Sequence, residues 1–141
     1  MVTSVINAVT KQLGTTFGTT YQYYVEDIEQ GVVKPCFHVA PRITLQRSKS
    51  PVLYDRTVPI VVHYFSDNLN NLKKDCYAMG ERVTECLEYL PFGDTILRGE
   101  DISWQMVDDV LQVFITYRFT TKKPVENYNM EALGSPNISV T

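Results

Sequence analysis

The sequence lacks several features that mark an enzyme or a nucleotide-binding protein. Its seven glycines are scattered instead of being grouped between a strand and a helix, so no phosphate-binding loop is visible. No Gly-x-Ser-x-Gly element is present, and both histidines fall inside strand patterns, which argues against nucleophilic catalysis. These absences predict a protein that is not an enzyme and that needs no cofactor.

Cysteines and long apolar runs are also scarce. The three cysteines form no close pair, and the first residues do not have the charged and apolar segments of a secretory signal. The most apolar stretch, residues 58–65, is interrupted by Pro59 and His63 and is far shorter than the roughly 20 residues of a membrane span. We therefore expect a protein of the reducing cytoplasm with no membrane partner.

Neither sign of charge dominates, since 13 Lys and Arg residues stand against 16 Asp and Glu residues, for a net charge of −3. This balance argues against binding of nucleic acid over the whole surface. Three interpretations of the local charge clusters stay open: a solvated surface, head-to-tail contact between subunits, or a basic rim that faces DNA. The basic cluster consists of Arg42, Arg47, Lys49 and Arg56, and the acidic clusters of residues 26–29 and of Glu81, Glu85 and Glu88.

Residues that suit a pleated sheet are abundant. Val, Ile, Thr and the 16 aromatic residues make up about 39% of the chain, so sheet should dominate. A length of 141 residues fits one domain with a single core. We predict a single α+β domain over residues 1–123 and an extended arm over residues 124–141, which is too poor in apolar residues for a core of its own.

Apolar periodicity predicts two helices. A stripe from Val2 to Leu13 indicates a short N-terminal helix that ends at Gly14. Spacings of alternating threes and fours over residues 66–90 indicate a long central helix. Its apolar stripe includes Leu69, Leu72, Met79 and Val83.

Two-residue alternation predicts strands at residues 21–25, 35–46, 57–65, 102–106 and 111–119, with a loop over residues 48–55. Asp108 and Asp109 form the expected turn between the last two strands. The fold class that follows is α+β, with a single mostly antiparallel sheet of four to five strands. The N-terminal helix and the long central helix pack on one face of this sheet.

Cys36, His38 and His63 are the one group with the chemistry of metal ligands. Cys36 and His38 share a strand face, and His63 lies on a strand that could pair alongside. The usual zinc-ligand spacings are missing, so packed and hydrogen-bonded side chains are favoured and no metal is predicted. Cys76 and Cys86 lie on the apolar helix stripe, where a free Cys behaves as a small hydrophobe.

Two segments have a composition that favours contact with another chain. The strand at residues 57–65 is apolar on both faces, so Val61 and Phe65 could meet another subunit. The arm ends in a short alternating stretch that could add a strand to a neighbour, with Tyr128, Ile138 and Val140 among its few apolar residues.

Four local strings, taken with the order of the expected elements, make the chain resemble the tail terminator proteins of long-tailed bacteriophages and phage-like prophage elements. The strings are EQGVVKPCF at 29–37, PIVVHYF at 59–65, LRG at 97–99 and DDVLQVF at 108–114. The resemblance spans most of the chain and includes no catalytic motif. Asp109 departs from the Gly expected at the second turn position.

The resemblance implies a structural subunit of a closed ring, usually hexameric, at the head-proximal end of the phage tail tube. The ring ends tube polymerisation and becomes the docking surface for neck or head completion proteins. It implies assembly in the host bacterial cytoplasm, incorporation into the virion tail, and at most weak contact with DNA in the lumen. The competing readings are a small metal-binding or enzymatic α+β domain and a nucleic-acid-contacting adaptor. The contact residues that the sequence suggests are Arg42, Arg47, Lys49, Arg56, Glu81, Glu85, Glu88, Val61, Phe65, Tyr128, Ile138 and Val140.

Overall fold

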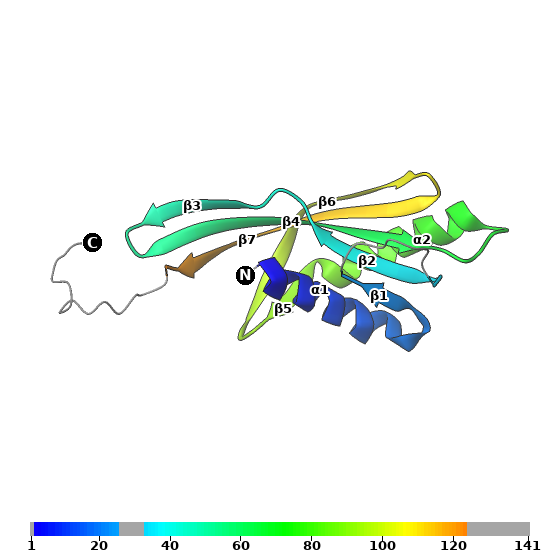
Figure 1. The fold of residues 1–141 in the computed structure, drawn as a ribbon, viewed down its shortest axis with the longest axis horizontal. Coiled ribbons are helices and arrows are strands. Elements are labelled where there is room, and N and C mark those ends of the chain that lie inside the picture. Colours follow the sequence, from blue (N-terminus) through cyan, green and yellow to red (C-terminus); the bar gives the residue numbers. More distant parts are fainter. Residues whose placement is uncertain (1, 26–32, 124–141) are drawn as a thin grey trace.

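The computed structural model describes residues 2–25 and 33–123, in which two α-helices lie on one side of a seven-stranded sheet (Figure 1). The N-terminal part contains α1 (Val2–Phe17), the 3-10 helix η1 (Gly18–Thr20), β1 (Gln22–Tyr24), β2 (Cys36–Pro41), β3 (Leu45–Ser50) and β4 (Leu53–Phe65). The second part contains α2 (Leu72–Leu87), β5 (Tyr89–Phe92), β6 (Thr95–Val107) and β7 (Val110–Lys122). Among the helices of the described ranges, none is long and apolar enough to cross a membrane.

The strand order in the sheet is β1-β2-β4-β7-β6-β5, and β3 pairs with β4 off this path. β1 and β2 are parallel, whereas every other pairing is antiparallel. The α+β class is therefore confirmed, but the prediction of four to five strands was too low. The two missed strands are β3 and β5, which pair with the sheet at its margins.

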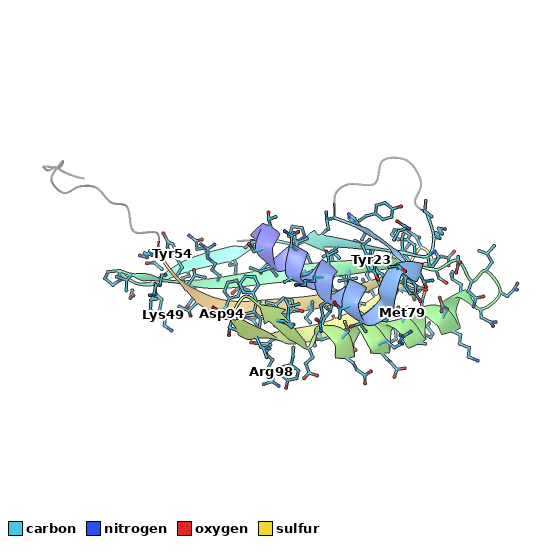
Figure 2. The ribbon with its side chains drawn as sticks, turned by 90° about the horizontal axis from the view of Figure 1, so that it is seen from below. Tyr23, Lys49, Tyr54, Met79, Asp94 and Arg98 are labelled. Atoms are coloured by element: carbon cyan, nitrogen blue, oxygen red, sulfur yellow. The ribbon has the colours of Figure 1, made fainter. Side chains whose placement is uncertain are left out.

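Regular spacing on both helices builds the core. α1 buries Val5, Val9, Leu13 and Phe17, and α2 buries Cys76, Met79, Gly80, Val83 and Leu87. Every second side chain is buried over residues 58–64 of β4 and 111–117 of β7, among them Ile60, Val62, Leu111 and Val113. Because alternate residues of a strand point to opposite faces, both helices cover the same face of the sheet. Figure 2 shows α1 in front of the sheet and α2 beside it, with Met79 labelled near the place where the two helices meet.

α2 is shorter than the central helix predicted over residues 66–90. Leu69 precedes the helix and is 85% exposed, and Leu72 at its first position is only partly buried, whereas Met79 and Val83 are buried as expected. At the other end, residues that continue the helical spacing form β5 instead. Pro91 is tolerated there because β5 is the last strand of the sheet, where a missing backbone N–H disrupts no ladder.

α1 also differs from its prediction, since Gly14 does not end it and the helix continues to Phe17. Phe17 is buried at 9% exposure, so its packing against the sheet extends the helix by one turn. The turn predicted at Asp108 and Asp109 is confirmed. Both residues have positive φ angles, of 51° and 63°, the conformation that a two-residue hairpin requires.

The segment after β2 differs most from expectation. The strand predicted over residues 35–46 ends at Pro41 and resumes at Leu45, and most of the predicted loop over residues 48–55 forms the hairpin between β3 and β4. The alternation is reset between the two strands, so Ile43 and Leu45 are 82% and 56% exposed instead of lying in the core.

β3 and the adjacent ends of β4 and β7 extend past both helices. We call this three-stranded part the blade: β3, residues 53–57 of β4 and residues 118–122 of β7. It lies at the left of Figure 1, and Lys49 and Tyr54 mark it in Figure 2. No residue of β3 is fully buried. Backbone pairing with β4 therefore holds β3 in place, and not a core of its own.

Candidate assembly surface

No helix of the described residues covers the opposite face of the sheet, which we call the open face. Every second residue of β4 points to it, and the register aligns neighbours from β2, β7 and β6 in rows. One row joins Ala40, Val61, Phe114 and Ser103. Val61 lies on this face as the sequence predicts, but it is only 8% exposed because its neighbours cover it. Phe65 lies at the end of the same strand and is half-buried.

A shallow groove of about 800 Å³ runs across the open face. The guanidinium of Arg42 lies 4.8 Å from the ring centre of Phe114, and Arg118 donates hydrogen bonds to Glu100 and Asp101 at 2.8 and 2.9 Å. The exposed Ile43 also lines the groove. Paired charges beside exposed apolar groups are typical of a protein contact surface.

Phe114 and Arg118 were missed from the sequence. Along β7 they alternate with the buried Leu111, Val113, Ile115 and Tyr117, so their side chains point to the open face. The sequence did contain one signal for this face: Phe114 is a bulky aromatic residue between the polar Gln112 and Thr116 on the side of the strand that faces away from the core.

The four predicted basic residues do not form one cluster. Arg42 follows β2 and lies in the groove, whereas Arg47, Lys49 and Arg56 belong to the blade. Arg47 pairs in register with Asp55, and the Nζ of Lys49 lies 4.0 Å from Oδ1 of Asp55, so Arg47 and Lys49 share one side of the blade. This side continues the open face.

The opposite side of the blade is held by polar contacts around Tyr54. The Nε of Arg56 donates to Oγ1 of Thr121 at 3.0 Å, and the Nζ of Lys123 donates to Oγ of Ser48 at 2.6 Å. Both cations lie over the ring of Tyr54, at 5.5 and 5.0 Å from its centre. Arg56 is therefore engaged within its own subunit, which distinguishes it from Arg47.

The three predicted acidic residues Glu81, Glu85 and Glu88 lie along α2 and just after it. Their spacing of four and three places them on one stripe of the helix surface, which begins with the exposed Tyr77. Glu81 and Glu85 are exposed, and within the described residues none of the three carboxylates has an ion pair. We call Tyr77, Glu81, Glu85 and Glu88 the acidic stripe.

His38 and His63 meet on the open face, as the sequence suggested. Their Nδ1 atoms are 3.4 Å apart and their rings are stacked. Cys36 is fully buried, and burial raises the pKa of its thiol, the opposite of what metal coordination requires. In the part of the chain that the structure describes, no group of three or more His, Cys, Asp or Glu side chains is placed to hold a metal ion.

The histidine pair predicts a pH dependence of stability. Partial burial, and secondly the neighbouring His38, lower the pKa of His63 from 6.5. Because the unfolded chain binds this proton more tightly, the free energy of unfolding is highest above pH 6.5 and falls as the pH drops through the folded-state pKa of His63. We expect His63→Gln to remove most of this fall, measured by denaturant titrations between about pH 7.5 and about pH 5.5.

His38→Gln is the matched control for this prediction. It removes the smaller cause of the pKa shift and leaves the burial of His63, so part of the pH dependence should persist. Parallel pH profiles for the wild-type protein and His63→Gln would contradict the assignment.

Three of the predicted contact residues, Tyr128, Ile138 and Val140, lie outside the described residues, as does the whole predicted arm over residues 124–141.

Comparison with known proteins gives a family. A family model described as "Phage tail terminator protein" matches residues 4–129. No curated protein matches the sequence. Among the solved structures that match, one is similar over 89% of this chain and 94% of its own, with 9% sequence identity and a TM-score of 0.41.

Proposed function

Because the chain belongs to the phage tail terminator protein family, and so has a structural role in a phage tail, we propose that it forms a homo-oligomeric ring, as a hexamer, on the head-proximal end of the tail tube. The ring stops polymerisation of the tube protein. Its free side then serves as the docking surface for a neck or head completion protein. Assembly takes place in the host bacterial cytoplasm, before the ring becomes part of the virion tail.

The observation that supports a ring most directly is the uncovered sheet face together with the blade. Both α-helices pack on the other face, which leaves long strands with one face exposed in the subunit. Ile43 and Leu45 are exposed on this side although they are large and apolar. Burying such groups against another protein chain is favourable by roughly 25 cal/mol per Å² of apolar surface.

The described residues favour a structural role over catalysis. The groove on the open face is shallow, and of its charged lining residues Arg118 is paired with Asp101 while Arg42 lies against the ring of Phe114. A reacting site would instead need a nucleophile and a base in reach of each other, with groups that stabilise developing charge. We therefore propose a non-enzymatic protein whose partners are copies of itself, the tail tube protein and a neck protein.

Imaging and genetics test this function together. Negative-stain microscopy of the purified chain over a concentration series is expected to show rings of uniform diameter. In a phage whose terminator gene is removed, tails should exceed their normal length, and the wild-type chain should restore it. A chain that stays monomeric at all concentrations and leaves tail length unaffected would refute the proposal.

The arm gives a further prediction for this function. Removing residues 124–141 takes away no residue of the core that the structure describes, so the shortened chain should keep the wild-type melting temperature within a few degrees. Ring formation or attachment to tails should be impaired, because an extended segment can add a strand to a neighbouring sheet edge. Normal rings and normal tail length with the shortened chain would contradict this role.

A further inference from the structure

Resting on the proposed ring, we propose that the blade of one subunit docks on the acidic stripe of α2 in the next subunit. The contact joins Arg47 and Lys49 on one copy to Glu81 and Glu85 on its neighbour. It is a head-to-tail contact, in which two different surfaces of the same chain meet.

The basic side of the blade is available for this contact. Within the described residues Arg47 has no hydrogen bond or ion pair from its side chain, and all of β3 up to Lys49 is exposed. Lys49 reaches Asp55 only at 4.0 Å, and both side chains are about half exposed. Such exposed pairs contribute little, so the approach of a second carboxylate can replace this one at small cost.

The acidic stripe is the matching surface. Glu81 and Glu85 are exposed and carry no ion pair with a described residue, and Arg82 between them turns away to lie 4.7 Å from the ring centre of Phe17. Lys73 and Lys74 lie in the first turn of α2, and Arg82 is the one cation of its later turns, so the stripe itself is negative at Glu81 and Glu85.

The spacings on the two surfaces agree. Residues two apart on a strand are separated by roughly 6.5 to 7 Å, and residues four apart on a helix by about 6 Å. Lys49 lies at the bulge between Ser48 and Ser50, but its Nζ lies 4.0 Å from Asp55, the register partner of Arg47. Both cations are therefore on one side of the blade and can face Glu81 and Glu85 at the same time. Each surface also has one exposed apolar side chain in line with its charges, Leu45 at 56% exposure and Tyr77 at 46%.

The placement of the surfaces requires two copies. The blade and α2 lie toward opposite ends of the elongated subunit in Figure 1, so the blade cannot fold back on the stripe of its own chain. A contact between two different surfaces of identical subunits repeats around an axis and closes as a ring when the rotation allows it. This is the symmetry that the proposed function needs.

A charge exchange tests the contact. Arg47→Glu with Lys49→Glu, or Glu81→Lys with Glu85→Lys, should each raise the protein concentration at half-assembly by roughly tenfold or more, since like charges then face each other. A chain with all four changes restores opposite charges and should assemble within about threefold of the wild-type concentration. Sedimentation and negative-stain imaging give the assembly state, and circular dichroism with thermal melting verifies the fold.

The matched control is Lys11→Glu with Lys34→Glu, which makes the same change in net charge as the reversal of Arg47 and Lys49 at two exposed residues outside both surfaces. It should assemble like the wild-type chain. Wild-type assembly in either two-residue reversal, or no recovery in the chain with all four changes, would overturn the contact. The contact is also overturned if Arg47→Glu with Lys49→Glu assembles normally but loses salt-sensitive binding of duplex DNA. That result would assign the basic side of the blade to DNA binding.

The outcomes separate this inference from the function on which it rests. Rings that persist in all variants would refute the blade contact and leave the proposed ring intact. Absence of wild-type oligomers, both in solution and on tails, would refute the ring and the contact with it.

Discussion

Replacing Phe37 by alanine is expected to lower the free energy of unfolding by about 3 to 5 kcal/mol, the range measured for large aromatic side chains removed from a core. Phe37 is fully buried on β2. Its ring lies between 5.2 and 5.7 Å, centre to centre, from four other aromatic rings. These belong to Phe17, Tyr21, Tyr23 and Tyr64.

The size of the loss follows from what this cluster connects. Phe37 is the common neighbour of the end of α1, of β1 and its preceding residue, and of β4, so its removal leaves a cavity that none of these elements can fill alone. Phe65→Ala is the matched control. Phe65 is also an aromatic residue of the sheet but is half-buried on the open face, so its truncation should cost clearly less.

Denaturant unfolding monitored by circular dichroism measures both variants, at concentrations where the midpoint does not depend on protein concentration. Equal losses for Phe37→Ala and Phe65→Ala would show that the aromatic cluster is not the centre of the core.

The second large effect is expected for Asp75→Ala. In the first turn of α2, Oδ2 of Asp75 accepts hydrogen bonds from Tyr64 Oη at 2.8 Å and from Ser66 Oγ at 2.5 Å. Both donor residues are only 2% exposed. Because an unsatisfied buried hydroxyl costs roughly 1 to 3 kcal/mol, losing this acceptor should lower the free energy of unfolding by at least about 2 kcal/mol.

Two variants bracket this prediction. Asp75→Asn keeps a carbonyl acceptor at the same position, so it should lose less than Asp75→Ala. Asp67→Ala removes an exposed carboxylate a few residues earlier and should change the stability by no more than about 0.5 kcal/mol. The pKa of Tyr64 is raised by burial and then by its bond to Asp75. Alkaline titration should therefore show it ionising at lower pH in Asp75→Ala, and an unmoved titration curve would contradict the network.

The sequence predicted those elements whose residues meet the core. β4, β7 and the buried side of α2 have one apolar face against a common layer, and this contact imposes the spacing from which they were predicted. The turn at Asp108 and Asp109 was predictable for another reason, because short polar side chains tolerate positive φ angles.

β3 and β5 could not be predicted by the same reasoning. No helix covers the blade, so Gln46, Arg47 and Ser48 have no apolar alternation, and only pairing with β4 makes them a strand. In β5, Pro91 is a residue that strands usually exclude, and it is tolerated because β5 lies at the margin of the sheet.

The sequence predicted single residues of the candidate surface but not how the fold arranges them. That Val61 and Phe65 face away from the helices follows from alternation alone. The sides on which Arg47, Lys49 and Arg56 emerge depend on the β3–β4 register and on the bulge between Ser48 and Ser50, which the sequence does not encode locally. The stacking of Arg42 on Phe114 likewise depends on which strands become neighbours.

The continuity of β4 and β7 has a mechanical consequence. The two strands pair without interruption from Leu53 and Lys122 in the blade to Tyr64 and Leu111 beneath the helices. No loop separates the blade from the part of the sheet that the helices cover, so the blade has no hinge and is expected to move with the sheet as one rigid unit. Its angle to α2 is set by the right-handed twist that the strands accumulate along their length. If the blade contacts α2 of the next subunit in the ring proposed above, this angle sets the rotation between neighbours, and the length of β4 and β7 then helps to determine the number of subunits.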